Sequence, residues 1–138
     1  MKQNRTIIPL LLITCLHTGF SIVQKNFEQT GIASYYSDAF HGRKTASGEI
    51  YDKNLFTAAH ATLPFFTMVK VTNLKNNKTV IVKINDRSPK YNKRMIDLSK
   101  AAAIKLDMIK DGIVNAKLEV INPSDTKTQK TTADSLVK

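Results

Sequence analysis

Tryptophan is absent from this sequence, and cysteine occurs once, at Cys15, among 138 residues. A single cysteine excludes an intramolecular disulfide, so the 42% hydrophobic content has to supply the core of what is one domain's worth of chain. Acidic side chains are also few, since 11 Asp and Glu stand against 21 Lys and Arg and the formal net charge is +10. A basic surface suits an anionic partner: nucleic acid, acidic lipid headgroups or an anionic cell-wall polymer.

The sequence also lacks an apolar run long enough to span a bilayer. Residues 7–16 are mostly apolar, and a run of about ten residues is typical of the apolar region of a secretory signal peptide. Lys2 and Arg5 supply the positive charge that precedes such a region. We therefore expect residues 1–21 to be a signal peptide and the protein to be exported to the periplasm or cell envelope. Export argues against nucleic acid as the partner.

Cys15 closes the segment Leu12-Ile13-Thr14-Cys15, which loosely resembles a bacterial lipobox. In a lipobox the cysteine is lipidated after cleavage and attaches the protein to a membrane. Thr14 stands where Gly, Ala or Ser is usual. Two interpretations stay open: a lipidated Cys15 that anchors the chain, or a Cys15 that is discarded with the signal peptide.

Short strands separated by turns dominate the remaining sequence. Residues 55–63 fit either a helix or a strand, and Ser99 is a suitable N-cap for a short helix over 100–106. Residues 22–30 read as a polar lead-in, and residues 122–138 lack apolar periodicity and are expected to be a disordered tail. Short strands with one small helix predict a mainly-β barrel, because closure removes exposed strand edges. The expected strands are residues 31–36, 68–73, 79–84, 95–98 and 114–121.

The strand over 79–84 runs into Asn85-Asp86-Arg87-Ser88-Pro89, which cannot continue it. Asp86 is therefore expected where a rigid strand ends and a loop begins, so that the core positions a carboxylate that can still reach a ligand. The alternative is a turn aspartate followed by a solvated arginine. A second carboxylate, Glu49, lies on a long irregular stretch over 37–49, and such loops are often functional. The sequence shows neither a glycine-rich phosphate loop nor metal-ligand spacing, so no cofactor and no metal are expected.

Four blocks of sequence then resemble a known family. In this order and spacing they resemble the rare lipoprotein A family of septal-ring lytic transglycosylases, over about residues 31–121. The resemblance implies a six-stranded double-psi β-barrel with one or two short helices, the architecture of barwin and expansin domains. The blocks are Gly31–Tyr36, Phe40–Glu49, Thr57–Pro64, and Val80–Pro89 followed by Arg94–Ser99.

The implied substrate is the glycan strand of peptidoglycan. Members of the family cleave the β-1,4 bond between N-acetylmuramic acid and N-acetylglucosamine, favour strands stripped of their peptides, and leave 1,6-anhydro-muramyl ends without using water. On the matching positions, Glu49 and Asp86 are implied to be the catalytic carboxylates. We expect Asp86 to be the acid and base because the strand end fixes it. Three roles stay open for Glu49: raising the pKa of Asp86, orienting the sugar, or donating the proton itself.

Further polar and aromatic residues match or flank the family's site. His60 and Asp97 match site positions, yet His60 could instead satisfy backbone groups at a turn and Asp97 could accept backbone donors near the helix start. Arg87 is expected to pair with Asp97 or Asp86. Either Tyr36 or its neighbour in sequence is expected to stack on a sugar ring, and the other to pack in the core.

Departures from the family pattern leave other functions open. Ser88 stands where the family usually has Gly, and would be strained if that position needs a positive φ angle. The sequence leaves no room for the C-terminal peptidoglycan-binding repeat domain that many members carry, so a septal role is undecided. Two alternatives to the enzyme are a non-catalytic, expansin-like wall-binding module and an envelope interaction module that docks to a protein partner.

Overall fold

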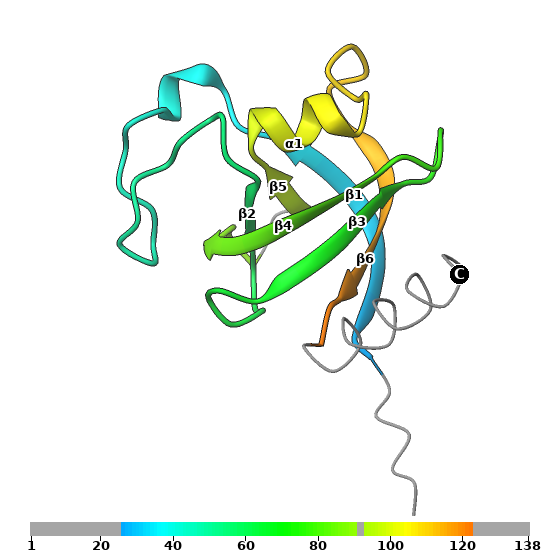
Figure 1. The fold of residues 1–138 in the computed structure, drawn as a ribbon, viewed down its shortest axis with the longest axis horizontal. Helices are drawn as coiled ribbons and strands as arrows, with labels where there is room; N and C mark the ends of the chain where they lie inside the picture. The colour runs from blue at the N-terminus through cyan, green and yellow to red at the C-terminus, as the bar shows by residue number, and fades with distance from the viewer. Residues whose placement is uncertain (1–25, 91–92, 123–138) are drawn as a thin grey trace, which may run out of the picture.

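Six strands form a closed barrel in the computed structural model, which describes residues 26–90 and 93–122. Around the barrel the strands follow the order β1-β5-β2-β4-β3-β6, so every strand has two neighbours. Figure 1 shows α1 lying over one end of this barrel, and the segment between β1 and β2 projecting to one side. The elements are β1 (Glu28–Tyr35), the 3-10 helix η1 (Asp38–Phe40), β2 (Thr57–His60), β3 (Met68–Asn73), β4 (Thr79–Asp86), β5 (Arg94–Leu98), α1 (Lys100–Lys105) and β6 (Val114–Val120).

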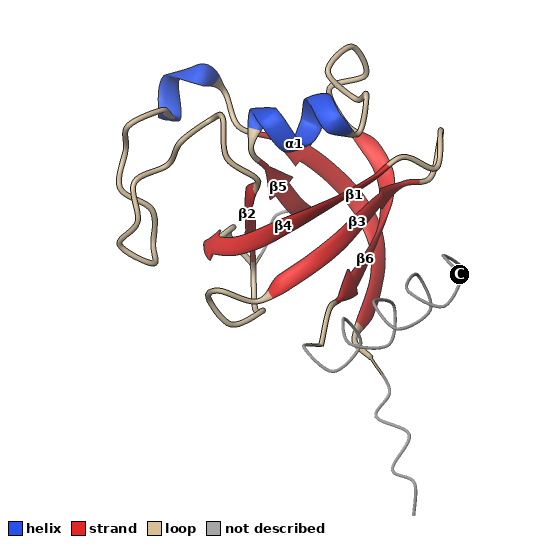
Figure 2. Ribbon diagram, viewed as in Figure 1, coloured by secondary structure: helices blue, strands red, loops and turns tan. Residues whose placement is uncertain are grey.

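The barrel contains both parallel and antiparallel pairs. β1 pairs with β5 and β2 pairs with β4 in parallel, and the remaining neighbours are antiparallel. Each parallel pair carries a register shift, between Ile32 and Ala33 and between Ala58 and Ala59. Parallel neighbours cannot be joined by a tight hairpin, so the chain has to cross the barrel between them. The predicted six-stranded double-psi barrel is confirmed, and Figure 2 shows how much of the described chain is strand.

Most of the predicted elements are found near their expected bounds. The hairpin of β3 and β4 is present, and residues 55–63, which fitted helix or strand, contain the buried strand β2. Ser99 caps α1, since its hydroxyl accepts from Ala102 N at 3.3 Å. The predicted lead-in over 22–30 is wrong for Glu28–Thr30, which pair with β6 although their side chains are exposed. Backbone hydrogen bonds to β6 extend β1 over these residues, and amino-acid composition does not reveal such bonds.

The barrel interior is filled mainly by β-branched and leucine side chains. One end is closed by α1, which contributes Ala102 and Ala103, and by its C-cap Leu106. Val82 and Ile84 of β4 are fully buried, and burying such a side chain stabilises the fold by about 1.5–3 kcal/mol. The carboxyl end of β4 is therefore a rigid part of the molecule. The fully buried aliphatic side chains include Val69, Val71, Val82, Ile84, Ile96, Leu98 and Leu118.

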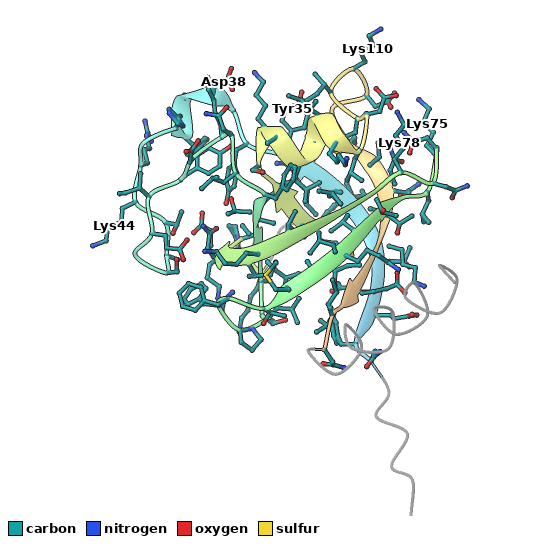
Figure 3. The ribbon with its side chains drawn as sticks, in the orientation of Figure 1. Tyr35, Asp38, Lys44, Lys75, Lys78 and Lys110 are labelled. Atoms are coloured by element: carbon teal, nitrogen blue, oxygen red, sulfur yellow. The ribbon has the colours of Figure 1, made fainter. Side chains whose placement is uncertain are left out.

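Positive charge is distributed over both sides of the barrel. Figure 3 shows Lys44 on the projecting segment and Lys75, Lys78 and Lys110 on the opposite side of the view. Lys75 pairs with Asp111 at 2.8 Å and Lys78 with Asp107 at 3.3 Å, so part of the charge is neutralised locally.

Some predictions fall outside the described residues. These are the signal peptide over 1–21, the lipidation of Cys15, and nearly all of the tail over 122–138. Within residues 26–90 and 93–122, no helix has the length and apolar character to cross a membrane.

Candidate active site

Asp86 is the last residue of β4, and three donors hold its carboxylate. Oδ1 accepts from Ala46 N at 2.9 Å and from Arg87 N at 2.8 Å, while Oδ2 accepts from the Tyr36 hydroxyl at 2.7 Å. The side chain is half-buried, so a ligand can still reach it. The expected placement, a strand-end carboxylate positioned by the core, is what the structure shows. Oδ1 has two donors and Oδ2 only one, which makes Oδ2 the oxygen with room for a proton.

Tyr36 follows β1 and reaches across to Asp86. Its ring packs against Tyr51 and Phe40, with centroid distances of 4.8 and 5.7 Å. Burial, and then the hydrogen bond to Asp86, raise the pKa of the Tyr36 hydroxyl far above its ordinary value. The hydroxyl therefore remains a donor at every physiological pH. Tyr36 supports the carboxylate, and its ring packs on protein aromatics instead of standing free to stack on a sugar.

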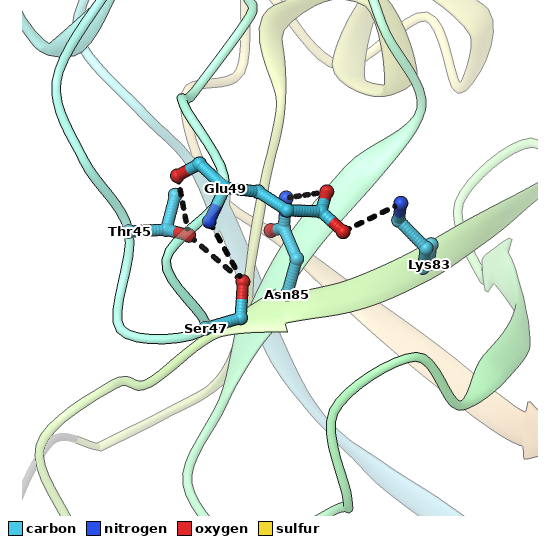
Figure 4. A network of polar contacts seen from close by, with 5 residues as sticks. All are labelled: Thr45, Ser47, Glu49, Lys83 and Asn85. Carbon is cyan, nitrogen blue, oxygen red and sulfur yellow. Dashed lines mark hydrogen bonds and ion pairs between the residues drawn. The ribbon is translucent and has the colours of Figure 1, made fainter.

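Glu49 lies on the loop of residues 37–56, and two side chains of β4 bind its carboxylate (Figure 4). Lys83 Nζ donates to Oε1 at 2.9 Å and Asn85 Nδ2 donates to Oε2 at 3.3 Å. The Lys83 hydrogen bond lowers the pKa of Glu49 below its usual value, with a smaller contribution from Asn85. Glu49 is thus an anion at neutral pH. An anion suits charge stabilisation or sugar orientation, and does not suit proton donation.

A compact turn delivers Glu49 to β4. The Thr45 hydroxyl donates to Glu49 O at 2.8 Å and lies 3.0 Å from the Ser47 hydroxyl. Gly48 has a φ of 95°, a conformation that side-chain-bearing residues rarely adopt, and this lets the chain reverse. Ser47 N donates to Asn85 O at 3.2 Å, which joins the turn to β4. The 37–56 loop is therefore an ordered part of the site.

Asp97 lies in the same row of the barrel as Asp86. Ala59 of β2 is the register partner of both aspartates, and Ser34 of β1 is the partner of Asp97. Register partners face the same side of a sheet, so the small Ala59 side chain separates two carboxylates. Asp97 accepts from the Ser34 hydroxyl and pairs with Arg94 at 3.6 Å. Both partners of Asp97 are side chains. The alternative prediction, in which Asp97 accepts backbone N–H groups near the helix start, is not what these contacts show.

His60 is buried and serves a turn. Its Nδ1 accepts from Thr62 N at 3.1 Å and Leu63 N at 3.0 Å. The proton therefore sits on Nε2, which donates to Gln29 Oε1 at 3.0 Å. Burial, and then the nearby Arg87 charge, lower the pKa of His60. These contacts support the backbone-satisfying alternative, and they are not contacts with either proposed catalytic carboxylate.

Arg87 does not make the predicted ion pair. Its Nη1 donates to the backbone oxygens of His60 at 3.1 Å and Asp86 at 3.5 Å, and the guanidinium lies 4.0 Å from the centre of the Phe65 ring. Among the ion pairs of the described residues none contains Arg87, and Asp97 pairs with Arg94 instead. The planar guanidinium stacks on an aromatic face and holds backbone, so Arg87 shapes the loop after Asp86.

Ser88 is tolerated where the family usually has Gly. Among the described residues, the non-glycine positions with positive φ are Phe66, Asn77 and Asp107, so Ser88 is not strained. Its hydroxyl is buried and has no hydrogen-bond partner. Residues 26–90 and 93–122 contain no group of three His, Cys, Asp or Glu side chains placed to hold a metal ion.

The sequence of the barrel is similar to that of known proteins. Residues 28–118 match the family described as lytic transglycolase. The chain is 55% identical over 100 residues to the endolytic peptidoglycan transglycosylase RlpA of Neisseria meningitidis, which covers 72% of this chain and 42% of that protein. It is 57% identical over 91 residues to the RlpA of Campylobacter jejuni. That alignment covers 66% of this chain and 33% of the relative. The chain therefore spans less than half the length of these relatives.

Solved structures share the barrel. The Streptomyces papain inhibitor superposes with a TM-score of 0.57 at 26% identity, covering 70% of this chain and 96% of that chain. The expansin of Clavibacter michiganensis superposes with a TM-score of 0.56 at 20% identity, covering 70% of this chain and 52% of that chain, a likeness of fold. Together with the site around Asp86, these matches show that the chain belongs to the lytic transglycolase family of double-psi β-barrels.

Proposed function

We propose that this protein is an endolytic peptidoglycan lytic transglycosylase that cleaves the bond between N-acetylmuramic acid and N-acetylglucosamine. The observation that carries the proposal is the carboxylate of Asp86, held by three donors at the end of a core strand, with the anionic Glu49 bound to Asn85, the residue before it. Family membership supports the same reaction. The proposal includes a preference for peptide-stripped strands, as the resemblance implies.

Asp86 acts as the acid and then as the base. Its protonated Oδ2 donates to the glycosidic oxygen, and the bond from that oxygen to muramyl C1 breaks with oxocarbenium character. The muramyl C6 hydroxyl oxygen attacks C1 while its proton passes to the Asp86 carboxylate. One C–O bond replaces another, the acid is regenerated, and no water is consumed.

Glu49 and Tyr36 assist this step in different ways. We assign to the Glu49 anion the stabilisation of positive charge that develops on the sugar, an interaction that strengthens toward the transition state. Tyr36 keeps Asp86 Oδ2 in place and remains protonated throughout, because its pKa is strongly raised. Asp97 lies across Ala59 from Asp86 and adds a second carboxylate to this part of the barrel.

The place of action follows from the substrate. Peptidoglycan lies outside the cytoplasm, so the proposal places the protein in the cell envelope. Export through the signal peptide over 1–21 and membrane attachment through Cys15 remain predictions from sequence.

A product assay tests the proposal. The chain lacking residues 1–21 is incubated with intact and amidase-stripped sacculi, and the soluble sugars are weighed by mass spectrometry. We expect anhydro products, one water lighter than hydrolysed ends, that are lost in Asp86→Asn and reduced in Glu49→Gln. Asp111→Asn is the matched control, because Asp111 pairs with Lys75 away from the site. Binding without soluble products, unchanged in the site variants, would instead support the expansin-like or envelope interaction module.

A further inference from the structure

Phe66 adopts a backbone conformation that aromatic residues rarely take. Its φ is 69°, and it is the third residue of the turn Pro64–Thr67, which Thr67 N closes by donating to Pro64 O at 3.3 Å. Turns with positive φ at this position usually carry Gly or Asn. Phe66 is nevertheless 57% exposed, so the fold gains little burial from the strained residue. A strained residue whose side chain is mostly exposed is a candidate for a functional role.

This turn is fastened to the strand that carries the site. Phe66 N donates to Ile84 O at 2.6 Å, and Ile84 N donates back to the next residue of the turn at 2.9 Å. Ile84 lies between Lys83 and Asn85, whose side chains both bind Glu49. Lys83 Nζ is 5.6 Å from the centre of the Phe66 ring and 2.9 Å from Glu49 Oε1. One ammonium group thus contacts both the aromatic ring and the site carboxylate.

We propose that Phe66 is a sugar-binding platform, whose exposed ring stacks on a pyranose of the glycan strand beside the Glu49–Lys83 pair. This inference rests on the proposed function for the identity of the polymer. An aromatic face carries partial negative charge, and the C–H groups on a pyranose face supply a flat, partly positive complement. An aromatic side chain has only two χ angles, so little side-chain entropy is lost when the exposed ring stacks on a sugar.

The position of Phe66 sets which sugar it contacts. Lys83 precedes Asp86 by three residues on β4, a rise of about 10 Å. We assign to Phe66 a sugar further along the strand than the two joined by the bond that Asp86 cleaves, next to the sugar that the Glu49–Lys83 pair faces. Phe66 consequently distinguishes a strand from a disaccharide, and gives the site a preference for extended glycans.

A competing use of the same surface is contact with lipid or protein. Met68 and Ile81 are 41% and 49% exposed, and both are close to Lys83: Met68 as its register partner and Ile81 two residues before it. These side chains extend the apolar surface beside Phe66. The glycan is favoured because the ring shares Lys83 with the site carboxylate.

Binding is measured in the chain carrying Asp86→Asn, which keeps the site shape but not its acid. Amidase-stripped glycan strands and the corresponding disaccharide are titrated by calorimetry. We expect Phe66→Ala to weaken strand binding about three- to tenfold and to leave disaccharide binding unchanged. Phe66→Tyr should retain the affinity. Ile104→Ala is the matched control, because Ile104 is 59% exposed on α1, outside this surface.

Phe66→Gly separates a binding role from a structural one. Glycine relieves the positive φ and removes the ring, so we expect the same loss of strand affinity with an unfolding temperature at least as high as that of the parent. With Asp86 restored, KM for strands should rise while kcat stays constant.

Three outcomes would overturn the inference: strand affinity unchanged by Phe66→Ala, equal losses for strand and disaccharide, or binding to anionic lipid vesicles that alone depends on Phe66. Failure of the enzyme proposal would look different. Anhydro products would then be absent from every protein with Asp86 intact, while the binding titrations still report on Phe66.

Discussion

The two carboxylates of the site are held by different means. Asp86 ends a strand whose neighbouring side chains are buried in the barrel, and two of its three donors are backbone amides. Glu49 lies on the 37–56 loop, and its carboxylate is bound by two side chains, Lys83 and Asn85. One carboxylate is thus positioned by packing and backbone, the other by polar contacts at a half-exposed surface. This difference suits a fixed proton donor beside a charge-stabilising group.

Of the changes to the two carboxylates, removal of the acid Asp86 should have the largest effect on activity. Asp86→Asn should lower the rate of anhydro-product formation by at least about a hundredfold, because amide nitrogen cannot replace the acid and base. Glu49→Gln should cost less, since only charge stabilisation is lost. Rates are compared on stripped strands by mass spectrometry. Equal losses in the two variants would show that the proposed division of roles is wrong.

The packing that fixes Asp86 can be weakened without touching it. Ile84→Ala removes a fully buried side chain two residues before Asp86 and should lower the free energy of unfolding by about 2–5 kcal/mol. Ile81→Ala on the same strand is the control, because Ile81 is 49% exposed and should cost less than about 0.5 kcal/mol. Urea unfolding followed by circular dichroism measures both. Similar losses would mean that β4 is not anchored by its buried face.

Tyr35 and Tyr36 allow the effect of a single hydrogen bond to be compared inside and outside the site. Tyr36→Phe removes the donor to Asp86 Oδ2 and should lower kcat about tenfold. Tyr35→Phe removes a bond to Ile109 O, at 3.1 Å, and should leave kcat unchanged while costing about 1 kcal/mol of stability. Steady-state kinetics and thermal unfolding separate the two effects. A kcat loss in Tyr35→Phe would contradict the assignment.

The smallest effect is the pH dependence of the ion pair on the loop. The pKa of Glu49 is lower in the folded chain than its reference of 4.5, so its stabilisation is present above that value and is lost as pH falls through the folded pKa. Both partners are 35% exposed, which limits the contribution to less than about 1 kcal/mol. Lys83→Met should therefore destabilise the protein at pH 7, and the difference from the parent should shrink as pH falls below 4.5. Thermal unfolding across this range checks the prediction, and a constant difference would exclude the linkage.

Local chemistry made several features predictable. The turn residues after 84 placed Asp86 at a strand end, Ser99 was recognised as an N-cap, and the hairpin of β3 and β4 followed from alternation and turn residues. The start of β1 was not predictable, because Glu28–Thr30 are polar and exposed and lack the apolar alternation of a strand, although their backbone pairs with β6.

The contacts inside the site were harder to foresee. Arg87 was expected to bind a carboxylate but binds backbone oxygens and the Phe65 ring, and His60 matched a site position but caps a turn. Phe66 carried no sequence signal, since its positive φ appears only in the folded turn.

The sequence by itself determined the β-rich architecture and the family, because these depend on local patterns and on residues at matching positions, and the same matches supplied the two carboxylates that we propose as catalytic. Tertiary structure decided which groups surround those carboxylates. Tyr36 and Asp86 are 50 residues apart and Glu49 and Lys83 are 34 apart, and the closed barrel and the 37–56 loop bring them together. These contacts depend on strand register and on how the chain crosses the barrel, and neither can be predicted from a short stretch of sequence.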